Sequence, residues 1–498
     1  MKKYIFILLF VMTGVLSGCD SYLDTEFSRG KDANEAIQNV DNANTALQGT
    51  YSLFYDYRFA GNFAMTLSDI PTDISYWNQQ TGHMNGIYEY ATDDNDTYLY
   101  YIWDYGYKIV SNATRLINQG DDLAKNLSSA SDKATLNGYL AQAHGLRAFA
   151  NLYMVNYFAH QYKVNGQDFG KEPGIVISDA TIQPYDTVHR ATIAESYAFI
   201  VKDLKTALDL FNNGADEPAE KVYLTKPAIE GLLARTYLYM EDWANAKSYA
   251  EAALKDGDID LNKGLAHTKA DYAALYQSTG SNNESFFYLS IDDTHNFSAN
   301  AAGNIWNTYS YSPSPKLQRL YASTDCRDTL IAWDVAVSSS TPTVPYYAGG
   351  KYGATKNGVN GVAYETNYLI NAPEMFLIIA EADIKQGNLS GAQENLFQVA
   401  RRNTAIKSVA DLPQTLDGLY SFLKDERARE LFQEGHRLWD LRRWGDKVSV
   451  VAYGAPNVKF NYTDYQISDL VYPIPNAEIN AHFGVEQNEG WAKTFPKK

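Results

Sequence analysis

The sequence predicts a mostly α-helical protein in which pairs of helices form a scaffold and an irregular, loop-rich lobe contains a few short strands. Apolar residues recur at helical spacing through much of the chain. One helix-pair pattern occurs twice, at widely separated positions, and the stretch between the copies is rich in Gly, Ser, Thr, Pro and Tyr. The chain has 498 residues, 45% of them hydrophobic, and no clear linker divides it, so it can bury one large core.

The N-terminus reads as a secretory signal peptide over residues 1–18. A short basic start, Met1-Lys2-Lys3, precedes an apolar run from Tyr4 to Val15. The next four residues, Leu16-Ser17-Gly18-Cys19, resemble a bacterial lipobox, in which cleavage precedes a cysteine that is then lipidated. We therefore expect lipidation at Cys19 and a polar tether over residues 19–32; the alternative is an ordinary signal peptide with a cysteine placed there by chance.

Cysteine content and charge restrict what the remaining chain does. Cys326 is the second of two cysteines, so a lipidated Cys19 leaves no disulfide framework. The net charge of -17 argues against nucleic acid or an anionic membrane surface as a binding partner. The body of the protein must therefore be stabilised by its core.

The region after the tether is the first candidate binding surface. Residues 33–54 have helical spacing, and sixteen aromatic residues follow between Tyr51 and Tyr107, twice the average density of the chain. A loop within this region carries Asp73, Tyr76, Trp77 and Asn78. A sugar ring can stack on the indole while amide and carboxylate groups bond its hydroxyls, so these four are predicted ligand contacts. The alternative for any single aromatic residue is packing in the core.

Helix pairs follow in the middle of the chain. Residues 139–157 and 192–211 are amphipathic, and Pro227 stands where a helix can begin. Residues 228–254 match a tetratricopeptide pattern, with small residues where the helices cross: Ala234, Ala246, Ala250 and Ala253. The same offsets return in residues 374–400, with Ala380 and Ala392 replacing Ala234 and Ala246. The copies are 146 residues apart, so an insertion over 256–372 interrupts the scaffold.

The insertion is predicted to be loop-rich. Its opening Asp-Gly-Asp-Ile-Asp run, residues 256–260, lacks the Gly and Glu of a calcium-binding loop, and we interpret it as a polar loop. Residues 285–291 favour a short strand, and residues 306–311 an aromatic turn. Asp325 and Arg327 are predicted to form an ion-paired turn.

The stretch Lys424–Trp444, KDERARELFQEGHRLWDLRRW, is predicted to form one long helix, with either a solvated charged face or Arg forks that bind carboxylates of neighbouring helices. Its pattern ERxxELFxEGHRxxDLRRWG resembles the C-terminal signature of the SusD/RagB family. The closing segment 470–491, with Pro-Ile-Pro and Gln-Asn-x-Gly-Trp, resembles the end of the same family. With the lipobox and the repeats, the resemblance spans nearly the whole chain.

The resemblance implies a lipoprotein anchored in the outer membrane, facing the exterior, that binds nutrient oligosaccharides and delivers them as a lid to a SusC-like TonB-dependent transporter. It also implies that a later lobe contributes ligand-facing aromatic residues, for which the candidates are Trp306, Tyr309 and Tyr346. Residues 33–498 are expected to form a single body. Its parts are a helical-repeat scaffold over 33–255 and 373–445, the insertion over 256–372, and a closing segment over 446–498.

We expect no catalysis, cofactor or metal. The sequence contains no G-x-S-x-G, HExxH or Walker motif. His436 and Asp440, four residues apart, could in principle bind a metal, although a paired structural histidine fits better. Three alternatives remain: a peptide-binding member of the same family, an α-helical glycoside hydrolase that uses a carboxylate pair, and a repeat scaffold that binds only protein.

Overall fold

The structure is a computed structural model that describes residues 36–77, 81–183, 185–259, 264–277, 282–291, 297–306, 311–330, 351, 366–450 and 462–496. It is mostly helical, as predicted, with short strands in two-stranded antiparallel pairs. Its longer helices are α2 (Val40–Tyr55), α5 (Thr97–Asn126), α6 (Ala130–Phe158), α7 (Ile193–Asn212), α8 (Lys226–Tyr239), α9 (Trp243–Asp256), α10 (Lys269–Gln277), α13 (Ala372–Lys385), α14 (Leu389–Ala400), α15 (Leu416–Glu430) and α16 (Arg437–Trp444).

The short elements lie between these helices. The short helices are α3 (Phe63–Thr66), α4 (Asn85–Tyr88), α11 (Ala302–Asn304), α12 (Pro315–Leu320) and α17 (Asn476–Asn480). The strands pair as β1 (Ser75–Trp77) with β7 (Tyr311–Pro313), β2 (Lys163–Val164) with β3 (Gln167–Asp168), β4 (Pro173–Val176) with β5 (Arg190–Thr192), β6 (Ser285–Leu289) with β8 (Asn367–Asn371), and β9 (Lys447–Val450) with β10 (Tyr462–Gln466). The strand predicted over 285–291 is β6.

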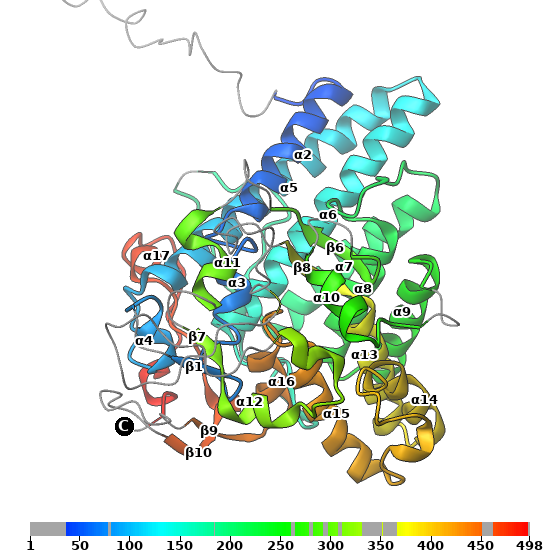
Figure 1. Cartoon of the computed structure of the whole chain (residues 1–498). Helices are drawn as coiled ribbons and strands as arrows, with labels where there is room; N and C mark the ends of the chain where they lie inside the picture. Colours follow the sequence, from blue (N-terminus) through cyan, green and yellow to red (C-terminus); the bar gives the residue numbers. More distant parts are fainter. Residues whose placement is uncertain are drawn as a thin grey trace, which may run out of the picture.

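The helical scaffold follows the predicted pairs. Helix α5 packs against α2 and α6, α6 packs against α7, and α8 packs against α9 (Figure 1). The second copy of the pair, α13 and α14, joins the first through contacts between α9 and α13. In both copies a side chain caps the second helix: Asp242 accepts a hydrogen bond from the Asn245 amide, and Asn388 accepts one from Gly391. The two distant sequence copies therefore form neighbouring parts of one scaffold.

Helix α2 is shorter than the helix that the apolar spacing of residues 33–54 predicts. It begins at Val40, because the side chain of Asn39 accepts a hydrogen bond from the Asn42 amide and caps the helix there. Ile37 lies two residues before the capping residue Asn39. Its backbone amide donates to the side chain of Gln119 on α5, so it makes a tertiary contact and is not part of the helix.

The predicted single helix over Lys424–Trp444 is wrong, because the chain breaks between α15 and α16. Gln433 and Gly435 adopt φ angles of 64° and 79°, in the left-handed region. A Cβ atom on Gly435 would lie 2.7 Å from the carbonyl oxygen of Met65, so glycine is required there. Tertiary hydrogen bonds replace the helical ones: the Gly435 and Arg437 amides donate to the two carboxylate oxygens of Asp69, at 3.1 and 3.0 Å.

Most charged residues of this stretch lie in the interior and form ion pairs, as one of the two interpretations of the sequence expects. We use the name buried ion-pair network for a set of these buried residues and their buried partners, which are Asp73, Glu284, Asp325, Arg327, Glu381, Arg402, Glu426, Arg427, Glu430, Arg437, Asp440 and Arg443. Arg327 contacts Asp325, Glu426 and Glu430 at 2.7 to 2.9 Å, which confirms the predicted ion-paired turn. Buried charges are stable only when they are paired in this way.

The network joins segments that are far apart in sequence. Arg443 binds both carboxylate oxygens of Glu381 on α13 at 2.6 and 2.7 Å, and Arg402 binds Glu284 at 2.6 Å. Burial alone would raise the pKa of Glu381, but the Arg443 guanidinium outweighs it and lowers that pKa to about 2. The carboxylate therefore remains ionised inside the core.

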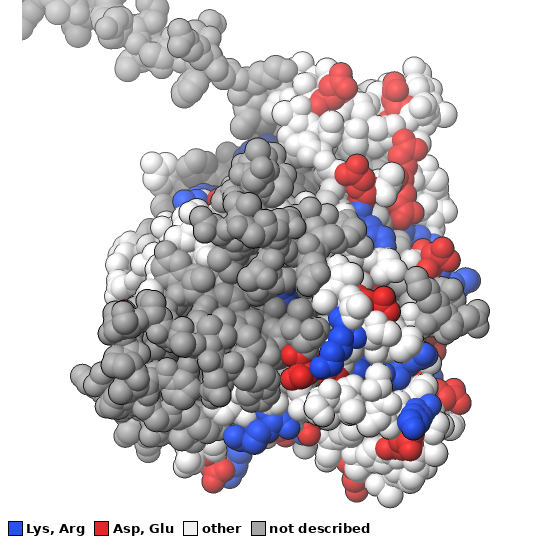
Figure 2. Space-filling model, in the orientation of Figure 1, with Lys and Arg blue, Asp and Glu red and all other residues white. Residues whose placement is uncertain are grey.

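The described surface carries mixed charge. In Figure 2, acidic side chains gather over the upper part of the helical scaffold, near the ends of α2, α5 and α6, while acidic and basic side chains alternate lower down. No helix among the described residues is long and apolar enough to cross a membrane.

Candidate functional site

Trp77 lies at the end of a short strand that connects the early loop to the insertion. Strand β1 pairs antiparallel with β7, and Trp77 stands opposite Tyr311. Side chains alternate along a strand, so the buried Tyr76 points to the opposite face from Trp77. Trp77 itself is half-buried. The structure thus brings the early loop and the later lobe together.

The indole of Trp77 is held in a fixed orientation. Its Nε1 donates a hydrogen bond of 2.9 Å to the carbonyl oxygen of Thr81. The ring of Tyr88, at the end of α4, packs against it with centroids 6.2 Å apart and planes inclined by 57°. The polar edge of the indole is therefore satisfied within the protein, while the residue as a whole remains partly exposed.

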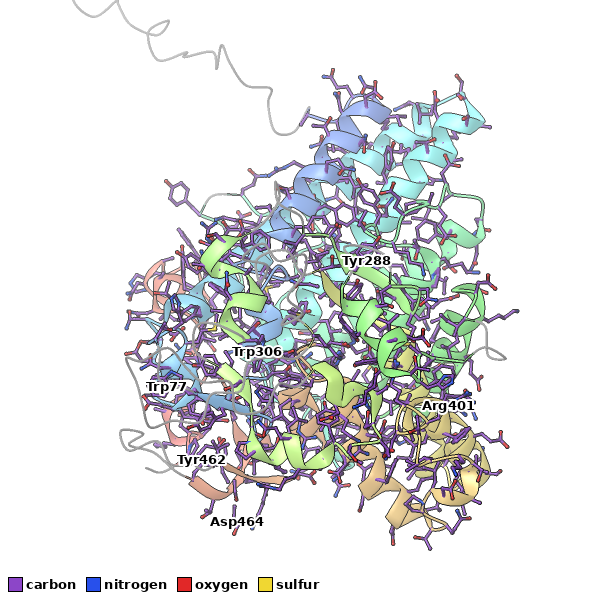
Figure 3. All side chains as sticks on the ribbon, viewed as in Figure 1. Trp77, Tyr288, Trp306, Arg401, Tyr462 and Asp464 are labelled. Atoms are coloured by element: carbon purple, nitrogen blue, oxygen red, sulfur yellow. The ribbon has the colours of Figure 1, made fainter. Side chains whose placement is uncertain are left out.

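An aromatic row runs from Trp77 into the core. Tyr88 contacts Tyr311 at a centroid distance of 5.8 Å, and Tyr311 contacts Trp306 at 6.2 Å. Trp306 in turn packs edge-on against Phe432, just beyond α15, at 5.3 Å. Figure 3 labels both tryptophans, one toward the edge of the molecule and the other farther inside the view. Tyr88, the ring that contacts Trp77, is thus supported in turn by the buried rings of Tyr311 and Trp306.

Three residues predicted to contact ligand are packed inside the protein. The Trp306 side chain is 0% exposed and Tyr76 is 1% exposed, so neither ring offers a face to a ligand in this structure. Asp73 is also buried: Arg437 donates to its two oxygens at 2.8 and 2.9 Å, and Lys316 contacts it as well. Alternation along β1 turns Tyr76 inward, and charge pairing holds Asp73 inside.

Ion pairing determines the protonation of Asp73. Burial would raise the pKa of its carboxyl, but the Arg437 guanidinium and the Lys316 ammonium hold that pKa well below its usual range. The Asp73 carboxylate thus forms ion pairs with two cations. Through Arg437 it connects the early loop to α16.

The remaining predicted residues Asn78, Tyr309, Tyr346 and Cys19 lie outside the described residues. The sequence interpretation did not single out Tyr88 or Tyr311 as neighbours of Trp77. The aromatic residues at positions 306, 309 and 311 were visible in the sequence, but the register of β1 on β7 depends on tertiary contacts that local spacing does not contain.

Asp69 connects the loop that carries Trp77 to the break between α15 and α16. Burial raises the pKa of its carboxyl to about 7, although the amide hydrogen bonds from Arg437 and Gly435 oppose that shift. Asp69 therefore carries a proton in part of the population near neutral pH. The backbone from Asp69 through Asp73 to Trp77 links the candidate site to this group.

The candidate metal pair His436 and Asp440 has other contacts. Asp440 accepts from Arg427 at 2.7 Å and from Arg443 at 2.9 Å. Burial, together with nearby arginines, lowers the pKa of His436 well below its usual value, so the imidazole is neutral. Within the described ranges, no group of three His, Cys, Asp or Glu side chains is arranged to hold a metal ion.

Comparisons with known proteins agree with this architecture. Residues 22–238 match the family model described as starch-binding and associating with the outer membrane, and residues 334–491 match the SusD family model. No curated protein matches the sequence.

Solved structures show the same fold. A SusD superfamily protein from Bacteroides vulgatus has a TM-score of 0.77 at 24% identity, covering 93% of this chain and 100% of its own. One from Bacteroides thetaiotaomicron has a TM-score of 0.76 at 21% identity, with 90% and 99% covered. A SusD-like carbohydrate-binding protein from B. vulgatus has a TM-score of 0.69 at 16% identity, with 93% and 99% covered. The chain is thus SusD-like: two family models of this type match residues 22–238 and 334–491, and the solved neighbours share its fold.

Proposed function

We propose that this protein binds nutrient oligosaccharides at the cell surface and delivers them, as a lid, to a SusC-like TonB-dependent transporter in the outer membrane. Lipidation of Cys19 would hold it there. The observation that carries the proposal is Trp77: a half-buried indole whose nitrogen is already bonded internally and whose ring is braced by Tyr88. The description of the matched family as starch-binding supports the choice of ligand.

The mechanism follows from how Trp77 is held. Stacking of a sugar ring on an indole that is already oriented costs little conformational entropy on binding. A single half-exposed ring offers modest contact to one sugar unit, so we expect oligomers to bind more tightly than monosaccharides. Capture outside the transporter raises the local substrate concentration at its entrance. The protein performs this role by binding, without chemical conversion of the sugar.

The test is isothermal titration of the purified protein with a panel of neutral oligosaccharides and with a mixed peptide digest. We compare wild type with Trp77→Ala and with Trp243→Ala, since Trp243 is equally half-buried but lies on α9. We expect oligosaccharide binding that Trp77→Ala weakens by about tenfold or more and Trp243→Ala leaves unchanged.

Other outcomes would overturn the proposal. Binding to the peptide digest alone would assign the protein to peptide uptake. Shortened oligosaccharides in the titration cell would show a glycoside hydrolase. Equal loss of affinity in both tryptophan variants would remove Trp77 as the ligand-binding ring.

A further inference from the structure

A groove along α5, separate from the Trp77 site, has the properties of a second ligand-binding site. A cavity of about 280 Å³ lies between α5, the loop that follows β4, and the C-terminal segment around α17. A second cavity of about 440 Å³ adjoins it farther along α5. The two share Trp103, Tyr107, Ser111 and Glu478, so they form one elongated groove. None of its lining residues belongs to the aromatic row of Trp77.

The walls of the groove are tied together. The Val188 amide donates to the carbonyl oxygen of Phe483 at 2.8 Å, and Arg190 donates to the side chain of Asn488 at 2.7 Å. Gly484 has a φ of 97°, and a Cβ there would lie 2.6 Å from the carbonyl oxygen of Val188. The close approach of the two segments thus requires glycine at that position. Such a site is largely preformed, which reduces the entropy lost on binding.

The aromatic residues of the groove have different exposure. Trp103 is 4% exposed, and its Nε1 donates to Glu478 at 3.2 Å, so it forms part of the floor. Tyr185 at the rim is 85% exposed and contacts Phe483 edge-on at a centroid distance of 6.0 Å. The backbone of Tyr185 has a φ of 73°, a conformation that is unfavourable for a bulky residue. The fold therefore holds a large aromatic ring in solvent at some cost.

The charges of the groove select against anions. Its carboxylates come from Asp104, Asp186 and Glu478; among the described residues that line it, the only cation is Lys108, which pairs with Asp104 at 2.7 Å. Carboxylate oxygens accept hydrogen bonds from hydroxyl groups, and the side chains of Ser111 and Gln183 can add further hydrogen bonds. A ligand that fits is neutral or cationic, with a flat apolar face and several donors.

We propose that this groove binds a neutral oligosaccharide, with one sugar ring stacked on Tyr185 and the hydroxyls of the chain bonded to Glu478 and Asp186. The sugar class rests on the proposed function; the existence and position of the site rest on the groove itself. Two rings that line the groove are exposed, Tyr185 at 85% and Tyr100 at 38%, and they belong to different cavities of it, so an extended ligand can contact both. The elongated shape fits a chain of sugar units better than a compact ion.

The test measures binding of the same neutral oligosaccharide panel to the full-length protein in three variants. Tyr185→Asn removes the ring and introduces a residue that tolerates the left-handed backbone conformation. Tyr185→Phe keeps the ring. Val409→Ala is the control, because it truncates an exposed apolar residue outside the groove. In the Trp77→Ala background, we expect residual binding that Tyr185→Asn weakens by about tenfold. Tyr185→Phe and Val409→Ala should leave that residual binding unchanged.

The outcomes separate this proposal from the proposed function. If Trp77→Ala abolishes binding and Tyr185→Asn has no effect in the wild-type background, the second site is refuted and the first is retained. If Tyr185→Asn alone reduces binding, the groove is supported and Trp77 is not the ligand-binding ring. Binding of choline or a lysine-rich peptide, with no oligosaccharide bound, would refute the sugar assignment. Thermal unfolding of each variant shows whether lost binding reflects lost folding.

Discussion

Around α15 and α16 most charged side chains are buried and paired, whereas in the α5 groove an aromatic ring reaches solvent beside carboxylates. Arg327 is 2% exposed and binds three carboxylates; Tyr185 is 85% exposed and its main aromatic contact is Phe483. In the first region the charged groups pair with one another inside the protein, so this region stabilises the fold. The second region leaves ring faces and hydrogen-bond acceptors available, which is what a ligand needs.

Loss of a buried cation should have the largest effect on stability. Arg327→Met leaves Asp325, Glu426 and Glu430 with fewer cations in the interior, and we expect the free energy of unfolding to fall by about 3–5 kcal/mol. Chemical denaturation of the purified variant measures this. Arg327→Lys keeps the positive charge but not the two-pronged geometry of the guanidinium, so its free energy of unfolding should fall by less.

A matched surface pair provides the control for that experiment. Lys125 contacts Asp122 at 2.8 Å on the exposed end of α5. Lys125→Met should leave the unfolding transition unchanged, because exposed pairs contribute little to stability. A similar loss in the Arg327 and Lys125 variants would contradict the distinction between buried and exposed pairs.

The two tryptophans of the aromatic row should differ in stability and in binding. Trp306→Ala removes a fully buried ring and should lower the free energy of unfolding by about 3–5 kcal/mol. Trp77→Ala should lower it by less than half as much, because the indole is partly in solvent. Denaturation of both variants decides the point; a larger loss for Trp77 would mean that this residue is structural.

The break between α15 and α16 should be sensitive to a single methyl group. Gly435→Ala places a Cβ 2.7 Å from the Met65 carbonyl oxygen at a φ of 79°, and we expect a loss of about 1–3 kcal/mol in stability. Gly387→Ala is the matched control, with the same φ of 79° and nothing within 4 Å of the added Cβ.

Because the Gly435 amide binds Asp69, Gly435→Ala should also weaken ligand binding that depends on Trp77. Gly387→Ala should cost about 1 kcal/mol, from backbone conformation alone, and leave binding intact. Equal unfolding energies for the two variants would show that the contact with Met65 relaxes freely.

A further prediction is a dependence of stability on pH near neutrality. The pKa of Asp69 is raised to about 7 in the folded protein, so its contribution to stability is fully present below about pH 4 and is lost as pH rises through 7. Glu426, whose pKa is lowered to about 2 because Arg327 and Arg429 outweigh burial, behaves oppositely: its contribution is present above about pH 4 and is lost toward pH 2.

Urea denaturation between pH 5 and 8 should therefore show wild type losing stability as pH rises, by up to about 1.4 kcal/mol per pH unit from Asp69. Asp69→Asn should flatten this slope, whatever its effect on absolute stability. Identical slopes in the two proteins would show that Asp69 is not the titrating group.

Local patterns in the sequence predicted the helix pairs, because the apolar spacing that marks α7 is also the spacing of its buried residues. Helices α8 and α13 are buried on nearly all sides, charged residues included, which apolar spacing did not indicate. Local patterns did not predict the break after α15 either. The residues at the break favour a helix locally, but their backbone amides form hydrogen bonds with Asp69, more than 360 residues away in the chain, in place of helical ones.

The candidate site was predictable in part for a similar reason. The composition around Trp77 indicated a binding loop, but composition does not distinguish the inward Tyr76 from the half-exposed Trp77. That distinction comes from the pairing of β1 with β7. The α5 groove joins three distant segments, so no short pattern in the sequence could indicate it.

The separation of the two helix pairs also affects how the chain folds. Helices α8 and α9 can associate early because they are adjacent in sequence, but Lys247 on α9 reaches its partner Asp383 on α13 across 136 residues. Closing so long a loop costs entropy before any contact repays it, and high contact order slows folding. The cost grows only with the logarithm of loop length, so shortening the insertion should accelerate docking of α13 on α9 more than it changes equilibrium stability. We therefore expect the repeat scaffold to be completed late, by the quarter of the protein that follows the insertion.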